Sequence, residues 1–192
     1  MRIVGGAYRG RRLAVPEGLD VRPSADRTRE AVFNVLEHWR YGDGRSLVDG
    51  ARVLDAFCGT GAYGLEALSR GAEEVTLLDH EPRALDAARA NARGMDAGGR
   101  LHWVMGDATG GAGRAAVARV HAAVDLVFMD PPWGSGLWRQ ALDALHDRGW
   151  IGAESLVVLE LSARETFDPP PGWTVIDERR HGAAVVRMLV LD

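Results

Sequence analysis

The chain has 192 residues, of which 46% are hydrophobic and 26% charged, a composition typical of one ordinary globular domain with a single substantial core. A single cysteine excludes an internal disulfide, and the lack of an N-terminal leader or of any run of about 18 apolar residues predicts a cytoplasmic protein that crosses no membrane. The net charge of −4 argues weakly against a polyanionic partner, whereas seven arginines and three acids within residues 1–29, a charge of +4, favour one for this segment.

The first 45 residues are predicted to form a small basic extension made of a hairpin and a helix. Residues 2–15 have the pattern of a short hairpin that turns at Gly5-Gly6, and apolar residues at helical spacing predict a helix from about 25 to 39, capped by Ser24. The candidate phosphate contacts of this extension are Arg2, Arg9, Arg11, Arg12, Arg22, Arg27 and Arg29. Other interpretations stay open, because the segment could instead be a solvated arm or the cover of a sheet edge, and arginines could pair with Asp26 and Glu30.

Strands and helices alternate over residues 46–192. Apolar runs predict strands at 52–57, 75–79, 101–105, 124–129 and 156–161, and helical spacing predicts helices at 61–70, 82–93, 112–122 and 136–147. The last two strands, 173–177 and 184–191, are joined by a link at Arg180-His181-Gly182 that is too short for a parallel crossover. This order predicts an α/β, Rossmann-like fold of the class I methyltransferases that use S-adenosylmethionine (SAM), with a seven-stranded, mostly parallel sheet and an antiparallel C-terminal hairpin.

A glycine-rich loop at the end of the first strand is the first candidate site. Gly59, Gly61 and Gly64 form a G-x-G-x-x-G pattern, which permits close approach of a cofactor to a helix N-terminus but fits NAD as well as SAM, or a purely structural turn. Asp55 favours SAM, because a carboxylate attracts a sulfonium and an amino group and repels the pyrophosphate of NAD. Phe57 lies in the same loop and is included among the expected cofactor contacts.

Acidic residues after the next two strands complete the predicted cofactor site. Asp79 ends the second strand, 20 residues beyond Gly59, where a carboxylate can accept both ribose hydroxyls of an adenosine. His80 follows it directly. Asp107 and Ala108 come after the third strand, where Asp107 could accept the adenine amine or could instead be a cap or turn residue.

The catalytic turn is predicted at Asp130-Pro131-Pro132-Trp133, directly after the fourth strand. An amine on an aromatic base is a poor nucleophile because its lone pair is delocalised into the ring. The Asp130 side chain and the Pro131 carbonyl could accept its two N–H groups, Pro132 would hold that carbonyl in place, and Trp133 offers a stacking face worth ~1–3 kcal/mol. A flipped-out base could then be methylated in line without a metal, although the same residues also suit an ordinary turn.

Other candidate sites are weak. The six histidines show no ligand spacing, so we expect no metal. Cys58 has no evident base partner and is interpreted as a small loop residue.

These motifs resemble the RsmD family of bacteria, which methylates the N2 amine of a guanine in 16S ribosomal RNA. The likeness is carried, in order, by Arg2-Ile3-Val4-Gly5-Gly6, Arg9-Gly10-Arg11, Arg22-Pro23-Ser24, Asp26-Arg27, Arg29-Glu30, Phe33-Asn34, Asp55 to Leu68, Asp130-Pro131-Pro132 and Glu160. The chain departs from the family at Trp133, where Phe or Tyr is usual, and at Ser24, where Thr is usual.

The resemblance implies that the arginine-rich segment 1–45 holds RNA and that residues 46–192 form the catalytic domain. It implies a cofactor site at Asp55, Gly59, Gly61, Asp79 and Asp107, with Asp130 to Trp133 as the catalytic turn. The implied substrate is 16S rRNA within a partly assembled small subunit, and we expect a monomer. An adenine-N6 or cytosine-N4 methyltransferase remains the first alternative, followed by an NAD-dependent oxidoreductase and a non-catalytic RNA-binding module.

Overall fold

The structure is a computed structural model that describes residues 1–16, 25–39, 46–95, 97–110 and 122–192. Two predicted features, the cap Ser24 and the RNA contact Arg22, lie outside the described residues. So does the helix expected at 112–122, apart from its last residue.

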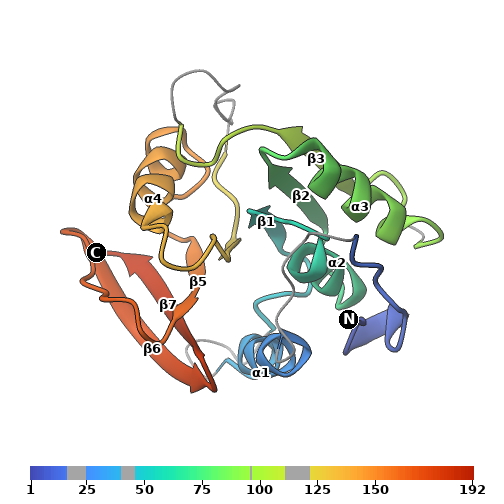
Figure 1. Ribbon diagram of the computed structural model, residues 1–192, viewed down its shortest axis with the longest axis horizontal. Helices are drawn as coiled ribbons and strands as arrows, with labels where there is room; N and C mark the ends of the chain where they lie inside the picture. The colour runs from blue at the N-terminus through green and yellow to red at the C-terminus, as the bar shows by residue number, and fades with distance from the viewer. Residues whose placement is uncertain (17–24, 40–45, 96, 111–121) are drawn as a thin grey trace.

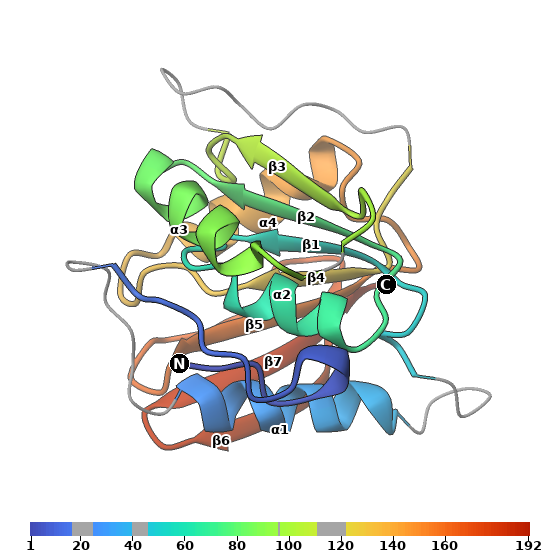
Figure 2. The same cartoon turned by 90° about the vertical axis from the view of Figure 1, so that its right-hand side faces the viewer.

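One seven-stranded sheet forms the centre of the molecule, in the order β3-β2-β1-β4-β5-β7-β6 (Figures 1 and 2). Its strands are β1 (Arg52–Ala56), β2 (Glu74–Asp79), β3 (Leu101–Met105), β4 (Leu126–Met129), β5 (Leu156–Ser162), β6 (Trp173–His181) and β7 (Ala184–Leu191). The first five are parallel, and β7 pairs antiparallel with both β5 and β6. The predicted class I methyltransferase fold is therefore confirmed.

Helices cover both faces of this sheet. Figure 2 shows α1 (Ala25–Glu37), α2 (Ala62–Ser69) and α3 (Pro82–Ala92) in front of the sheet, with α4 (Leu137–Asp147) behind it. Pro82 occupies the first turn of α3, as predicted, because its missing N–H is one that an α-helix leaves unpaired there. None of the helices in the described residues is long and apolar enough to cross a bilayer.

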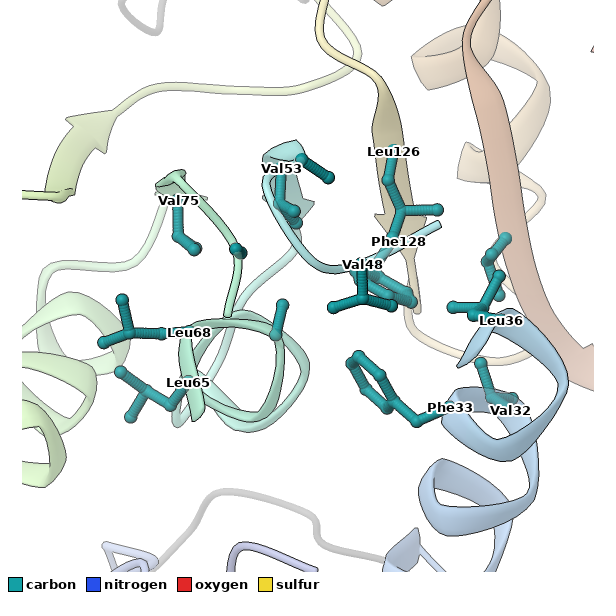
Figure 3. Close-up of a cluster of buried hydrophobic side chains, with 14 of the residues drawn as sticks. Val32, Phe33, Leu36, Val48, Val53, Leu65, Leu68, Val75, Leu126 and Phe128 are labelled. Atoms are coloured by element: carbon teal, nitrogen blue, oxygen red, sulfur yellow. The ribbon is translucent and has the colours of Figure 1, made fainter. Parts of the chain in front are cut away.

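Side chains on the two faces of the sheet belong to two hydrophobic clusters. On β4, Leu126 and Phe128 join the cluster under α1 and α2, whereas Val127 and Met129 pack toward α4. Figure 3 shows Phe33 of α1 beside Phe128, so the N-terminal extension and the sheet share one core. Because side chains alternate across a strand, Asp130, two residues after Phe128, is directed to the α1 and α2 face.

The N-terminal hairpin differs from its prediction at the turn. A bridge pairs Arg2 with Arg12, but a short 3₁₀ helix, η1 (Gly6–Tyr8), replaces a tight turn at Gly5-Gly6. The cause is tertiary: the Tyr8 N–H donates to Ser69 Oγ at 2.9 Å, and that hydroxyl donates to the Gly5 carbonyl at 2.6 Å. A Cβ on Gly6 would lie 1.9 Å from the Ser69 carbonyl oxygen, so only glycine permits this approach.

The C-terminal hairpin is longer than predicted. Its strand β6 continues to His181 rather than ending near 177, so the predicted link is mostly strand, with a register irregularity between Val175 and Asp177. The added part of β6 carries charged residues. This is possible because β6 is an edge strand of the sheet, where charged side chains can reach solvent. Hydrophobic patterning alone could not locate this end.

Candidate functional site

A cavity of about 640 Å³ lies where the carboxyl ends of β1, β2, β4 and β5 meet. It brings together Asp55 and the whole predicted catalytic turn, Asp130 to Trp133. Four more predicted cofactor residues line it: Phe57, Gly59, Asp79 and His80. Residues separated by some 75 positions share this space because parallel strands end at one edge of the sheet.

The glycine loop wraps tightly around the Asp55 side chain. Its carboxylate accepts the Gly64 N–H at 2.8 Å, and a Cβ on Gly64 would lie 3.2 Å from the same oxygen. Gly61 has φ +79 and caps α2 within the packing between Leu77 and Ala88, so it shapes the loop without lining the cavity in the described structure. Phe57 is the one described non-glycine residue with positive φ, 63°, a strained conformation at the cavity wall.

The electrostatics of the cavity are acidic. Its lining includes the five acidic residues Asp55, Asp79, Glu81, Asp130 and Glu160 and one arginine, Arg29. Burial raises the pKa of Asp55 well above its ordinary value of 3.8; the Gly64 hydrogen bond opposes this shift, and the charges of Asp130 and Asp79 add to it. A cationic ligand would therefore be attracted here, and a pyrophosphate would be repelled.

Asp79 is fixed as an acceptor at the opposite side of the loop. One of its carboxylate oxygens accepts the Gly59 N–H and the other accepts the Glu81 N–H, both at 2.9 Å. Each oxygen has a second lone-pair direction for a ligand hydroxyl. His80, partly exposed, has its Nδ1 3.7 Å from an Asp79 oxygen.

Within the predicted catalytic turn, the carbonyl of Pro132 has hydrogen-bond partners inside the turn. The Pro132 carbonyl accepts both the Ser135 N–H, at 3.2 Å, and the Ser135 hydroxyl, at 2.5 Å. These two bonds engage the carbonyl oxygen of Pro132 and stabilise the turn. Trp133 is half-buried and lines the cavity beside Asp130.

A buried tyrosine–glutamate pair at the cavity was not predicted. The Tyr63 hydroxyl donates to Glu160 Oε2 at 2.7 Å, and the Tyr63 ring stacks on Phe128 with centroids 4.9 Å apart. Burial, followed by the nearby charge of Glu160, raises the pKa of Tyr63 well above 10.0. The sequence signal was a lone acid in the otherwise apolar strand Leu156–Ser162.

Two predicted cofactor residues lie elsewhere. Asp107 and Ala108 do not line the cavity in the described part of the chain. One Asp107 carboxylate oxygen accepts the Thr109 N–H at 3.0 Å and the Thr109 hydroxyl at 2.7 Å, so Asp107 stabilises this turn, and its contact with a cofactor stays a prediction. Ala108 is buried in the cluster beneath α4.

The predicted RNA-binding arginines divide into exposed and buried groups. Arg2, Arg9, Arg12 and Arg27 are exposed, and Arg11, partly buried, donates from Nη2 to the Arg93 carbonyl.

Arg29 is a correction to the predicted RNA-binding set. Only 1% of it is exposed, and it pairs with Asp26 at 2.9 Å and with Glu66 at 3.5 Å. Its guanidinium lines the cavity and is paired with these two carboxylates, so it is not an exposed phosphate contact like its neighbours in the sequence.

Glu66 of α2 was not predicted either, and it attaches the N-terminal extension to this helix. Its fully buried carboxylate accepts the N–H groups of Val4 and Gly5, each at 2.8 Å, and the Arg70 Nε at 2.7 Å. Asn91 makes a similar link, since its amide exchanges two hydrogen bonds with the backbone of Ala14 and donates to the Thr60 carbonyl. A glutamate inside the apolar stretch of α2 was the available signal.

No second chemical centre is found in the described ranges. They contain no group of three His, Cys, Asp or Glu side chains that could hold a metal ion. Burial raises the pKa of the Cys58 thiol, which is 6% exposed, so this cysteine is not a nucleophile at neutral pH.

Comparison with known proteins agrees with this geometry. A family described as conserved hypothetical protein 95 matches residues 1–190. Ribosomal RNA small subunit methyltransferase D of Escherichia coli (strain K12) is 32% identical over 189 residues, or 98% of this chain and 88% of that protein. The chain belongs to the RsmD family.

Further similarities extend over the same length. A protein of Haemophilus influenzae has the same name, ribosomal RNA small subunit methyltransferase D. It is 28% identical over 98% of this chain and 92% of its own length. A solved structure of yhhF from E. coli matches with a TM-score of 0.81 and 33% identity, covering 100% of this chain and 98% of that one. The resemblance to the RsmD family is therefore confirmed for the whole chain, including its N-terminal extension.

Proposed function

We propose that this RsmD-family protein transfers a methyl group from SAM to the exocyclic N2 amine of a guanine in 16S rRNA. The observation that carries the proposal is the single acidic cavity in which the glycine loop and Asp55 face the Asp130 to Trp133 turn. Relatives named for the small-subunit rRNA supply the substrate class. We further propose a cytoplasmic monomer that acts on a partly assembled small subunit.

The cavity residues fit SAM by their chemistry. Asp55 and the surrounding negative charge suit the cationic amino and sulfonium groups, and the Asp79 oxygens can accept the ribose hydroxyls. Gly59 lies at the wall, where its lack of a side chain allows close approach. When bound, SAM supplies an electrophilic methyl group.

Asp130 and Pro131 prepare the nucleophile in this proposal. The Asp130 carboxylate accepts one N–H of the amine and the Pro131 carbonyl accepts the other, since the Pro132 carbonyl is already taken by Ser135. These bonds favour a pyramidal nitrogen whose lone pair is free to react. Trp133 stacks on the flipped-out base, and Asp130 also offers an oxygen to the proton that the amine loses.

The experiment that tests the proposal is mass spectrometry of rRNA after incubation with the protein and isotopically labelled SAM. Small subunits, free 16S rRNA and DNA serve as parallel substrates. We expect N2-methylguanine in small-subunit rRNA. A labelled adenine or cytosine would overturn the assigned base, and tight NAD binding without methyl transfer would overturn the activity.

We expect the affinity for SAM to rise with pH through the range in which Asp55 loses its proton. Burial raises the pKa of Asp55 in the folded protein above its value in the unfolded chain. The folding stability that the protonated carboxyl contributes is therefore lost as pH rises through the folded-state pKa. A cationic ligand favours the ionised form, and binding releases the proton. Affinity should therefore fall by up to about tenfold per pH unit below that pKa. Calorimetric titration with SAM at several pH values measures this, and the same slope in Asp55→Asn would contradict it.

We also propose that residues 1–45 form an RNA-contact extension of the catalytic domain 46–192. The exposed Arg2 and Arg12 lie opposite each other in the N-terminal bridge. Met1, the neighbour of Arg2, lines the cavity, so this basic segment begins at the rim of the proposed active site.

Replacing Arg12 or Arg27 with alanine is expected to weaken RNA binding and to flatten its dependence on salt. Each lost phosphate contact should reduce the slope of log K against log salt by about 0.7–0.9. Filter binding at several salt concentrations measures the slope. Arg52→Ala is the matched control. Arg52 pairs with Asp125 at the start of β1, and the cavity lies at the opposite, carboxyl ends of the strands. Equal effects in all three variants would argue against a localised contact.

A further inference from the structure

Glu160 lies beside the catalytic aspartate on the neighbouring strand. The register pairs Met129 of β4 with Leu159 of β5, so the next residues, Asp130 and Glu160, are at adjacent positions on strands ~4.8 Å apart. Both follow residues of the cluster under α1 and α2 by two positions, Phe128 and Val158, so both side chains point to that face of the sheet. Both line the cavity.

Tyr63 holds the Glu160 carboxylate in a defined orientation. Its hydroxyl donates to Glu160 Oε2 at 2.7 Å, and its ring is fixed by the stack on Phe128. Because a carboxylate has two oxygens, the bond to one of them orients the other. The hydroxyl is a donor at neutral pH, because even the ordinary pKa of a tyrosine is about 10, and burial raises the pKa of Tyr63 further.

Glu160 lies on the side of Asp130 that is away from the proposed cofactor residues. The residues proposed to hold SAM, Asp55, Gly59 and Asp79, come from β1, β2 and the loop after β1. The strand order continues from β1 to β4 and then to β5, so Asp130 separates Glu160 from the cofactor residues. If Asp130 holds the amine of a base, the ring nitrogen beside that amine can face Glu160.

The atom next to the reactive amine differs among the bases. In guanine, the N2 amine is flanked by N1–H, which is a hydrogen-bond donor, and by N3, which is a lone-pair acceptor. In adenine the ring nitrogen beside the N6 amine is N1, and in cytosine the one beside the N4 amine is N3; both of these are lone-pair acceptors. A carboxylate therefore pairs with a guanine whose N1 side faces it, whereas adenine and cytosine have no ring N–H beside the amine to donate.

We propose that Glu160, positioned by Tyr63, accepts the N1–H of the substrate base and thereby selects guanine over adenine and cytosine. The inference rests on the proposed function, because it assumes that the amine is held by Asp130. It assigns Glu160 to base selection and Tyr63 to positioning Glu160, and neither residue transfers the methyl group.

The test replaces the methylated guanine of the RNA by 2-aminopurine, which has the same 2-amino group but a bare lone pair at N1. A third RNA carries 6-thioguanine, which keeps N1–H and has sulfur in place of the O6 oxygen. Wild-type protein should methylate the guanine and 6-thioguanine RNAs, with kcat/KM for 2-aminopurine lower than for guanine by at least about 10²-fold.

The Glu160→Gln variant should lose most activity on guanine and less on 2-aminopurine, because the amide can donate to a bare N1. Its preference for guanine should therefore fall at least about tenfold. Tyr63→Phe keeps the ring stack and should lower the same preference with unchanged SAM affinity. Glu154→Gln, an exposed glutamate just before β5, is the matched control and should keep the wild-type preference.

The outcomes separate the inference from the proposed function. Methyl transfer to neither guanine nor 2-aminopurine by wild-type protein would overturn the proposed function and, with it, the inference. Transfer to both bases at equal rates would overturn the inference alone. A Glu160→Gln or Tyr63→Phe protein that loses activity equally on both bases would also overturn it, since a purely structural role does not change the ratio.

Discussion

Replacing Asp130 with alanine is expected to lower methyl transfer roughly 10²–10³-fold, the range seen when one precisely placed hydrogen-bonding group is removed from a catalytic site. The variant should still bind SAM, because the residues proposed to hold SAM lie on β1, β2 and the loop after β1. A radiolabelled methyl-transfer assay on small-subunit RNA measures the first effect, and calorimetry measures the second. The lowered value should be kcat, since Asp130 is proposed to act on the reacting amine.

Asp125→Ala is the matched control for this prediction. Asp125 precedes the same strand, at its opposite end, and forms a solvent-exposed pair with Arg52 at 3.1 Å. Such a pair contributes about 0–1 kcal/mol, so activity should stay near that of the wild type. Wild-type activity in Asp130→Ala, or a loss of SAM binding as large as the loss of activity, would contradict the assigned role.

Replacing Glu66 with alanine is expected to lower the free energy of unfolding by about 3–5 kcal/mol, the cost of removing one partner of a buried ion pair. The carboxylate is fully buried and accepts from Arg70 and from the Val4 and Gly5 N–H groups. Its removal leaves the Val4 and Gly5 N–H groups without their acceptor and takes one carboxylate partner from each of the buried Arg29 and Arg70, which keep Asp26 and Glu37. Urea unfolding followed by tryptophan fluorescence measures the loss.

Glu73→Ala provides the comparison, because Glu73 is an exposed glutamate a few residues beyond the same helix. Its effect should be within about 0.5 kcal/mol. A loss below 1 kcal/mol in Glu66→Ala would show that the N-terminal extension is held by its apolar contacts instead. Faster proteolysis within residues 1–16 of the Glu66 variant would identify the extension as the part released.

Glu66 also connects the two halves of the proposed activity. It lies on α2, the helix that begins at the glycine loop, and it binds the backbone of the segment whose arginines are proposed to contact RNA. Asn91 links Ala14 of that segment to Thr60 of the loop. The N-terminal extension and the glycine loop, proposed to contact RNA and the cofactor, are thus linked by buried polar groups.

The sequence by itself determined the sheet, the glycine loop and the position of the Asp130 to Trp133 turn after β4, because each depends on local chemistry. Apolar runs specify buried parallel strands, Gly59 and Gly61 permit left-handed backbone at the loop, and the residues after parallel strands must meet at one edge. The meeting of Asp55 and Asp130 in one cavity followed from strand order alone.

Only the tertiary structure decided which charged groups are buried and what they contact. Arg29 belongs to an arginine-rich segment but pairs with Glu66, and Tyr63 meets Glu160 across 97 positions of sequence. The 3₁₀ turn at Gly6 likewise depends on Ser69. The physical reason is that a buried polar group takes its partner from whatever element packs against it, and spacing along the chain does not encode that neighbour.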